Sequence, residues 1–294
     1  MRSRDHHRQE VQAFLQANFS VRRWDLTFPQ GSGHETYRAR SDDGAYFVKL
    51  GAQSARYEAL TSVGLTPPVL VVGTLEDGTS ILVQPWLLAR TPTRADYLAH
   101  LEQIATAVHN THHNLQLQRV LPTAASDLYS YAGSEALARI ERRWGNFKAQ
   151  VPNEVDFVDR SLADLAAQVR SLSGAGLVAS HNDMCNANWL VTPEDRFYLV
   201  DLELMSLDDP AADLGATLWW YYPPALRGKF LEIAGYADNE VLRQRMRVRM
   251  AIHCLSIILP REGSFDSYDP TSFGQSLTDF RAALAGEQNP QGYD

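Results

Sequence analysis

A chain of 294 residues, of which 45% are hydrophobic and 21% charged, is long enough to bury a substantial core and predicts one large domain or two lobes. Its 35 acidic and 27 basic side chains give a net charge of −8 at pH 7, which argues against nucleic acid and anionic membranes as partners. The two cysteines cannot form a disulfide framework, the polar N-terminus has no secretory signal, and no apolar stretch reaches the roughly 18 residues of a bilayer span. We therefore expect a cytoplasmic protein that binds no nucleic acid and no membrane.

The N-terminal part of the chain predicts a short helix followed by a small antiparallel sheet. Apolar residues spaced three to four apart indicate the helix within residues 9–19. Short apolar or alternating segments with turn residues between them indicate strands in WDLTF, ETYRAR, AYFVKL, VLVVGTL and SILVQPW. Asp-Gly pairs at 43–44 and 77–78 are typical of tight hairpins, and residues 54–63 between them predict a helix.

The larger remainder of the chain predicts a mainly helical lobe. Helical periodicity is found over residues 94–118, 127–148, 155–172, 210–222, 224–234 and 240–259. Three short apolar segments, at 177–180, 188–191 and 197–204, predict strands around two polar turns. Loops of this kind often carry functional residues, so the two polar turns are candidate sites of chemistry.

The first polar turn contains His181, Asp183 and Asn188 in the pattern H-x-D-x-x-x-x-N, and Asp201 ends the strand that follows. Phosphoryl transfer needs a carboxylate to orient the attacking hydroxyl and oxygen ligands to hold Mg²⁺ on the nucleotide phosphates. The predicted hairpin returns the chain, so that Asn188 and Asp201 can face one ion. Asp and Asn are also ordinary turn residues, but their occurrence in order with a lysine upstream favours phosphoryl transfer.

The predicted sheet contains candidate phosphate-binding residues. Gly31, Ser32 and Gly33 lie between two strands, where glycines let backbone N–H groups approach phosphates, although glycine also occurs in plain hairpins. Lys49 follows one strand later and can pair with phosphates. Glu58, on the next helix, can orient Lys49, unless it is simply a solvated surface residue.

With these motifs in place, the chain resembles bacterial small-molecule kinases of the aminoglycoside phosphotransferase and choline kinase superfamily over residues 24–225. The segments SHNDMCNANWLV, YLVDLEL and DDPAADLG are similar to the family's catalytic loop, metal-binding segment and following helix start. The resemblance implies an α+β, protein-kinase-like fold with two lobes. Residues 1–88 would form the nucleotide-binding lobe, with its small antiparallel sheet and one helix, and residues 89–294 the helical catalytic and acceptor-binding lobe.

The resemblance also implies roles for the catalytic residues. Asp183 would be the catalytic base, and Asn188 and Asp201 would be the magnesium ligands. Lys49 and Glu58 would form the pair that positions the phosphates. ATP or GTP and Mg²⁺ are the implied cofactors.

Supporting and nucleotide-binding roles follow from the same resemblance. His181 would be structural, and Asp213 would brace the catalytic loop through hydrogen bonds. The strand end at residues 83–87, which includes Gln84 and Trp86, would receive the adenine base.

Candidate acceptor-binding residues lie in the metal-binding segment and at the start of the following helix. Trp219, Trp220 and Tyr222 follow the Asp213 helix start, and aromatic faces attract quaternary ammonium groups by about 0.5–2 kcal/mol each, although such a run more often fills a core. Asp208 is a candidate for binding a polycationic aminoglycoside, and Glu203 for binding a second ion or the acceptor.

These observations predict a Mg²⁺-dependent phosphotransferase that moves the γ-phosphate of ATP or GTP to a hydroxyl of a small, cationic molecule. The H-N-D sequence at residues 181–183 resembles choline kinases and slightly favours choline or another amino alcohol. An aminoglycoside O-phosphotransferase and a catalytically inactive nucleotide-binding module are the alternatives. A protein kinase is disfavoured because DDPAADLG begins eight residues after Asp201 (209 − 201), which leaves no activation loop.

Overall fold

The computed structural model describes residues 4–21, 23–29, 35–122, 133–172, 176–260 and 271–289. The chain divides into two compact units, of which one comprises residues 1–91 with 189–203 and the other residues 92–188 with 204–294. The predicted boundary after residue 88 therefore needs a correction, because a segment far along the chain belongs with the first unit. Each unit is described by itself.

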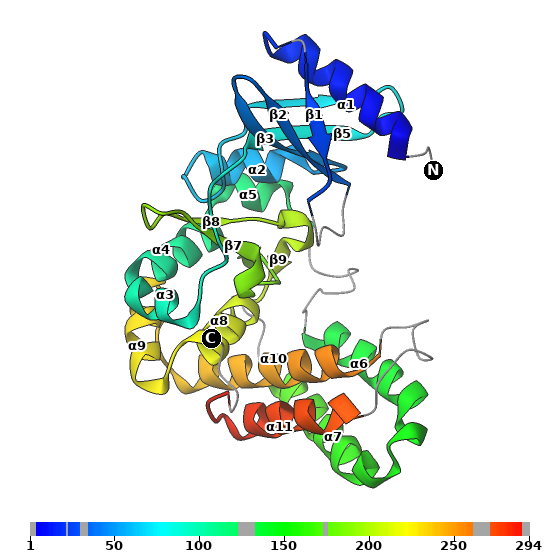
Figure 1. Ribbon diagram of the computed structural model, residues 1–294. Coiled ribbons are helices and arrows are strands. Elements are labelled where there is room, and N and C mark those ends of the chain that lie inside the picture. The colour runs from blue at the N-terminus through cyan, green and yellow to red at the C-terminus, as the bar shows by residue number, and fades with distance from the viewer. Residues whose placement is uncertain are drawn as a thin grey trace. The chain divides into compact units, whose positions relative to one another are not determined.

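The first unit is built on a five-stranded antiparallel sheet in the order β1-β2-β3-β5-β4 (Figure 1). Its strands are β1 (Asp25–Thr27), β2 (Thr36–Ser41), β3 (Gly44–Leu50), β4 (Val71–Thr74) and β5 (Ser80–Pro85). Both predicted hairpin turns are present, and Gly78 has a φ of +88°, a conformation that residues with a Cβ rarely adopt. The predicted helix in this region is α2 (Ser54–Thr61), which ends before Gly64.

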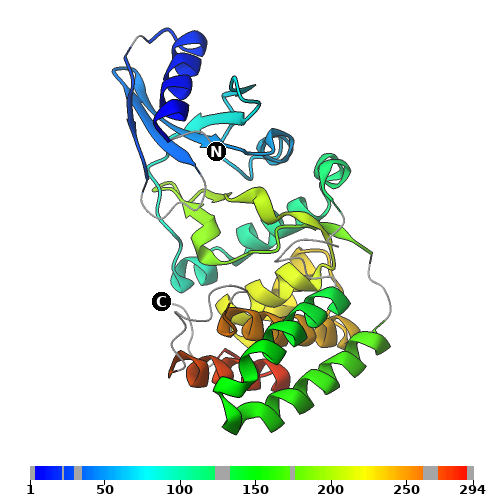
Figure 2. The same cartoon turned by 90° about the vertical axis from the view of Figure 1, so that its right-hand side faces the viewer.

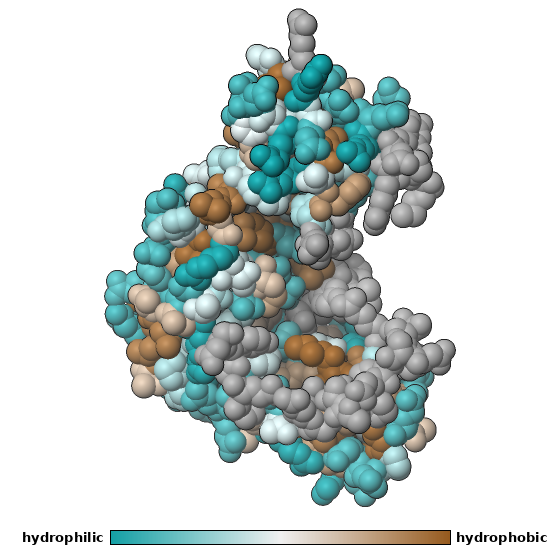
Figure 3. Space-filling view, in the orientation of Figure 1, coloured by the Kyte–Doolittle hydropathy of each residue, from teal (hydrophilic) through white to brown (hydrophobic). Residues whose placement is uncertain are grey.

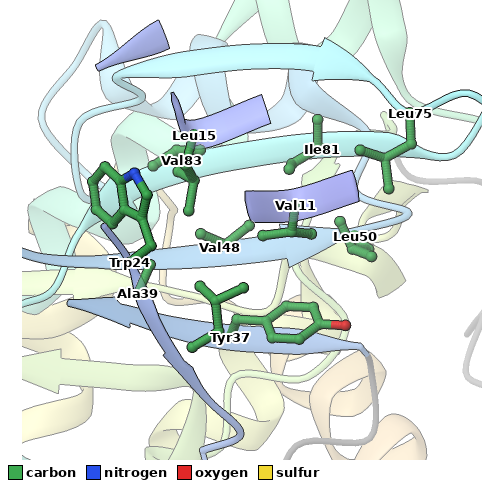
Figure 4. Close-up of a cluster of buried hydrophobic side chains, with 11 residues drawn as sticks. Val11, Leu15, Trp24, Tyr37, Ala39, Val48, Leu50, Leu75, Ile81 and Val83 are labelled. Atoms are coloured by element: carbon green, nitrogen blue, oxygen red, sulfur yellow. The ribbon is translucent and has the colours of Figure 1, made fainter. Parts of the chain in front are cut away.

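Helix α1 (Arg4–Asn18) covers one face of this sheet. Val11 and Leu15 of α1 are fully buried in a cluster with Val48 and Ile81 of the sheet (Figure 4). Burial of an aliphatic side chain of this size contributes about 1.5–3 kcal/mol, so α1 is a structural part of the unit. Gly73 of β4 lies under α1, where a Cβ would overlap the Phe14 ring.

The opposite face of the sheet carries Lys49. Because side chains alternate along a strand, Val48 points into the core under α1 and Lys49 points away from it. Lys49 is opposite Thr36 of β2 on one side and Leu82 of β5 on the other. The sheet therefore separates its apolar core from the face on which the predicted phosphate-binding lysine lies.

A hairpin of β7 (Trp189–Val191) and β8 (Phe197–Leu199) completes the first unit. Val191 forms an isolated bridge with Arg90, and the Leu199 N–H donates to the Leu65 carbonyl at 2.7 Å. These main-chain bonds explain why residues 189–203 group with the N-terminal sheet. The predicted strand at 197–204 ends at Leu199, and the chain continues as a 3₁₀ turn at residues 202–204.

The second unit is mainly helical, as predicted (Figures 1 and 2). Its helices are α3 (Arg94–Ala99), α4 (Leu101–His112), α5 (Leu115–Val120), α6 (Gly133–Phe147), α7 (Val155–Ser171), α8 (Ala211–Tyr221), α9 (Pro224–Ile233), α10 (Glu240–Ile258) and α11 (Thr271–Ala285). Helix α10 packs against both α8 and α11. The single helix predicted over 94–118 is three helices, α3, α4 and α5. The last of them begins after Asn114, which caps it by accepting a hydrogen bond from the Leu117 N–H.

Two strands, β6 (Val178–Ser180) and β9 (Ser206–Asp208), pair antiparallel within this helical unit. They place the polar turn after β6 beside the start of α8. No helix within the described ranges is long and apolar enough to cross a membrane. On the face shown in Figure 3, the surface of the first unit mixes hydrophilic groups with small apolar patches.

Candidate functional site

In the first unit, Lys49 is held between two carboxylates. Its Nζ lies 3.0 Å from Asp201 Oδ1 and 2.6 Å from Glu203 Oε2. The lysine side chain is 6% exposed, whereas that of Asp201 is 47% exposed. The structure thus brings together Lys49 and Asp201, two residues that the sequence predicted to act on the same phosphates, and adds Glu203 to them.

Helix α2 fixes Glu203 through two neighbouring residues. The Tyr57 hydroxyl donates to Glu203 Oε1 at 2.9 Å, and burial together with the charge of Glu203 raises the pKa of Tyr57, so the phenol remains a donor. Arg56 Nη1 donates to the carbonyls of Leu202 and Glu203 at 2.8 and 2.6 Å. Both the main chain and the carboxylate of residue 203 are therefore tied to α2.

The predicted pairing of Lys49 with Glu58 requires a correction. Glu58 is exposed on α2, whereas Tyr57, one residue earlier and about 100° around the helix, is buried toward Glu203. The carboxylates at Lys49 come instead from the segment after β8. Periodicity predicts that a helix exists, but it does not determine which face of a short helix meets the sheet.

Asp201 has a φ of +59°, in the left-handed region, which is uncommon for residues other than glycine although asparagine and aspartate adopt it more often than most. Such a conformation costs of order 1–3 kcal/mol and persists where surrounding contacts stabilise it. Here Lys49 binds the side chain, and the bonds from Arg56 fix the two residues that follow. The strain is concentrated at the residue that the sequence identified as a metal ligand.

Three of the predicted nucleotide-binding residues, Gly31, Ser32 and Gly33, lie outside the described residues. Gln84 is described, and its buried side chain donates from Nε2 to the Pro67 carbonyl at 2.5 Å, while its nucleotide-binding role stays a prediction. Trp86 is partly buried on the sheet face that carries Lys49, with the Arg38 guanidinium 4.6 Å above its ring.

In the second unit, Asp213 braces the main chain of the polar turn, the role predicted for it. Its carboxylate accepts hydrogen bonds from the backbone N–H groups of His181 and Asn182, at 2.7 and 2.8 Å. His112 of α4 lies 3.1 Å from the same carboxylate through Nε2 and 2.7 Å from the Tyr236 hydroxyl through Nδ1. Burial alone raises the pKa of Asp213, but the His112 hydrogen bond and the nearby imidazoles hold it below the usual value.

His112 and Tyr236 were not predicted as parts of this network. The spacing of His109, His112 and His113 places them on one helical face but does not indicate that the middle histidine faces a carboxylate. Both His112 and Asp213 are almost completely buried, which makes the brace a core feature of the unit.

The turn itself is further ordered by asparagine side chains. Asn182 has a φ of +65°, and its Nδ2 donates to Ser206 Oγ at 2.6 Å. Asn188 Nδ2 donates to the Asp183 carbonyl at 2.9 Å, which leaves the amide oxygen as the atom with which Asn188 can bind a cation. Asn186 is held through its N–H by the Tyr221 hydroxyl at 2.6 Å.

Asp183 lines a small pocket in the second unit with Cys185, Trp220, Arg249 and His253 among its other walls. Burial and the charge of Asp183 raise the pKa of Cys185 to about 12, so this thiol is unreactive as a thiolate at neutral pH. Burial lowers the pKa of His253, which keeps its imidazole neutral. The predicted catalytic aspartate therefore lies at the wall of a small cavity of about 30 Å³.

Of the acceptor-binding residues predicted on and near α8, only Trp220 lines this pocket. Trp219 is buried and donates from Nε1 to the Glu287 carbonyl at 3.0 Å, and Tyr222 is fully buried with its hydroxyl on the Tyr97 carbonyl. Asp208 is buried in an ion pair with Arg249 at 2.6 Å, so its charge is already neutralised. The predicted acceptor roles of Trp219, Tyr222 and Asp208 are corrected to structural ones.

The two predicted metal ligands fall in different units, Asn188 in the second and Asp201 in the first. Their joint binding of one ion remains a prediction. Within the described parts of the chain, no group of three or more His, Cys, Asp or Glu side chains is arranged to hold a metal.

Comparison with known proteins supplies the family context. The model of APH, a phosphotransferase enzyme family, matches residues 16–249. A solved choline/ethanolamine kinase family protein from Mesorhizobium loti is 17% identical, with 95% of this chain and 98% of that chain covered and a TM-score of 0.65. Choline kinase LicA from Streptococcus pneumoniae is 17% identical over 96% and 98% of the two chains, with a TM-score of 0.56.

An antibiotic kinase has a comparable likeness. Spectinomycin phosphotransferase APH(9)-Ia, solved with ADP and spectinomycin, is 14% identical over 95% of this chain and 96% of that chain, with a TM-score of 0.62. At these identities the likeness establishes a shared fold, and the predicted α+β, protein-kinase-like fold class is confirmed.

Proposed function

Because the chain belongs to the phosphotransferase enzyme family and is a small-molecule kinase, we propose that it transfers the γ-phosphate of ATP or GTP to a hydroxyl group of a small molecule with Mg²⁺ as cofactor. The observation that carries this proposal is the position of Asp183. It lies beside a pocket, on a turn whose main chain is held by a buried carboxylate. Such a fixed, accessible carboxylate is what orientation of an attacking hydroxyl requires.

In this proposal the first unit binds the nucleotide. Lys49 supplies a positive charge for the phosphates, on a sheet face that also carries the Trp86 ring for contact with the base. Structures of relatives contain nucleotides: ADP in spectinomycin phosphotransferase, AMP in LicA and GDP in aminoglycoside 2'-phosphotransferase-IIIa. These ligands support nucleotide binding and leave ATP and GTP as the two candidates.

The donor set of the first unit fits a magnesium ion. Asp201 and Glu203 bring two carboxylates together beside Lys49, and the half-exposed Asp201 offers the hard oxygen ligands that Mg²⁺ prefers. Asp201 would hold the ion, together with the amide oxygen of Asn188. When bound, Mg²⁺ neutralises negative charge on the phosphates.

The second unit provides the hydroxyl-orienting group. Asp183 would accept the hydrogen bond of the acceptor hydroxyl and receive its proton as the phosphoryl group is transferred. Asp213 would keep the main chain of the turn in place during the reaction. Most of the rate enhancement would come from positioning and charge stabilisation.

For the acceptor, we favour choline or another amino alcohol over an aminoglycoside. Trp220 presents an aromatic ring to the pocket of Asp183, which suits a single ammonium group. Asp208, which would have favoured a polycation, is neutralised by Arg249. The asparagine of the H-N-D sequence is weaker support for choline. Its φ of +65° is a backbone conformation that favours Gly or Asn at this position whatever the substrate is.

A nucleotide-consumption screen tests the proposal. The chain would be incubated with Mg²⁺ and ATP or GTP against choline, ethanolamine, aminoglycosides, amino sugars and homoserine, with Asp183→Ala as the background. Turnover with an amino alcohol that is lost in Asp183→Ala supports both parts of the proposal. Turnover with an aminoglycoside only would overturn the acceptor assignment, and equal consumption by both proteins would overturn the role of Asp183.

A further inference from the structure

The carboxylates around Lys49 come from an unexpected part of the chain. Asp201 and Glu203 both follow β8, while α2, the helix packed beside them, contributes no carboxylate to the contact. Glu203 makes the shorter of the two contacts, at 2.6 Å against 3.0 Å for Asp201, and its side chain is 19% exposed against 47%. The contact with Asp201 has the geometry of a hydrogen bond, whereas the contact with Glu203 is an ion pair that solvent screens less because Glu203 is less exposed.

Tyr57 gives Glu203 a fixed orientation. The phenol donates to Oε1 while Lys49 approaches Oε2, so the two oxygens of one carboxylate are divided between two partners. The Lys49 ammonium also lies 5.8 Å from the centre of the Tyr57 ring, within the range of a cation–π contact. Tyr57, Glu203 and Lys49 form a closed triangle of contacts inside the first unit.

We propose that Glu203, oriented by Tyr57, is the residue that positions Lys49 for the nucleotide phosphates in this chain, in place of a glutamate on α2. This inference rests on the proposed function. Glu203 and Tyr57 are positioning residues, since both act on the phosphates through Lys49. Helix α2 then contributes to the nucleotide site through a phenol and a guanidinium instead of a carboxylate.

The decisive experiment is a double-mutant cycle on nucleotide binding, which is measured with ADP by titration calorimetry on the full chain. Tyr57→Phe removes one hydroxyl and keeps the ring, and we expect it to weaken ADP binding about three- to tenfold. Glu203→Gln should weaken it about tenfold or more. Because Tyr57 acts through Glu203, Tyr57→Phe should cause no further loss in the Glu203→Gln background.

Binding without a divalent cation separates positioning of Lys49 from metal ligation by Glu203. The same titrations are run with ADP in EDTA. If Glu203 positions Lys49, Glu203→Gln weakens ADP binding in EDTA by about the same factor as in Mg²⁺. Loss in Mg²⁺ only would assign Glu203 to the metal and overturn the inference.

Two further variants act as controls. Tyr46→Phe changes a tyrosine of β3 that packs with Phe19 and Trp24, and it should leave ADP binding unchanged within twofold. Glu58→Gln would weaken ADP binding as Glu203→Gln does only if the α2 glutamate were the partner of Lys49, and that result would overturn the inference. Additive losses of ADP affinity in the double mutant of Tyr57 and Glu203 would also overturn it.

In steady-state kinetics, Tyr57→Phe should raise the KM for the nucleotide and leave the KM for the acceptor unchanged. A general loss of folding would instead lower the fraction of active enzyme and change neither KM. Absence of ADP binding in the unmodified chain would contradict the proposed function itself. Binding that none of these variants changes would contradict only the inference.

Discussion

Lys49 in the first unit is held by ion pairs to two side chains, whereas the turn of Asp183 in the second unit is held through its main chain by one buried carboxylate. The pair with the half-exposed Asp201 can be exchanged for a pair with an incoming phosphate or cation more readily than the less exposed pair with Glu203. Backbone hydrogen bonds to a fully buried aspartate cannot be exchanged without opening the core. The comparison indicates a charge-based, exchangeable arrangement for the ligand and a rigid one for the catalytic group.

The largest effect is expected for Asp183→Ala, which removes the proposed catalytic carboxylate but not its support. Turnover should fall by about 10²–10⁴-fold, the usual contribution of a general base. ADP binding should stay within about twofold, since the first unit provides the nucleotide contacts in the proposed function. Steady-state kinetics and ADP titration on the same preparation check this, and substantial remaining turnover would show that another group orients the hydroxyl.

Asp213→Asn tests the rigid support of the turn that carries Asp183. The amide keeps the shape but presents an N–H₂ where two backbone N–H groups and His112 need acceptors, so we expect a stability loss of about 3 kcal/mol and a lower kcat. Denaturant unfolding measures the first quantity. The control is Glu102→Gln, which breaks an exposed pair with Lys229 and should cost no more than about 1 kcal/mol.

A smaller effect is expected at Asn182, where backbone conformation and side-chain bonding can be separated. Asn182→Gly keeps access to a positive φ and loses the bonds to Leu204 and Ser206, whereas Asn182→Ala loses the bonds and also strains the backbone. The alanine variant should therefore be less stable than the glycine variant by about 1 kcal/mol. The ranking of acceptors should be the same in both, and a changed ranking would restore residue 182 as a specificity determinant.

The smallest effect on stability is expected from the contact of His7 with two carboxylates in the first unit. His7 of α1 lies 2.7 Å from Glu35 through Nδ1 and 3.1 Å from Asp77 through Nε2, and these hydrogen bonds raise its pKa above 6.5. A raised pKa in the folded state means that the stabilisation is complete below the unfolded value and is lost as pH rises through the folded value. Thermal unfolding between pH 6 and 9 should show this slope, and it should be absent in His7→Gln.

The structural context of the candidate residues was predictable because it depends on local spacing. Asp183, Asn188 and Asp201 surround a short hairpin, and Lys49 lies in an alternating strand, so local pattern determined their context. Asp213 was predicted as a brace from family resemblance, and the structure shows the two hydrogen bonds through which it acts.

Other features depend on packing that no local pattern encodes. Glu58 and Tyr57 are neighbours on α2, and only the rotation of that helix against the sheet decides which of them meets Glu203. The aromatic residues at the end of α8 also depend on packing. Trp220 lines the pocket of Asp183, whereas Trp219 and Tyr222 are buried and donate hydrogen bonds to main-chain carbonyls. Helix α11 was not predicted from the sequence either.

The grouping of residues 189–203 with the N-terminal sheet has a consequence for anyone who wishes to divide this protein. A fragment that stops at residue 91 keeps the buried ammonium of Lys49 and discards both of its counter-charges. Exchange of nucleotide-binding parts between relatives must therefore transplant two separate stretches of sequence through three junctions, at 91, 188 and 203, instead of making a single cut.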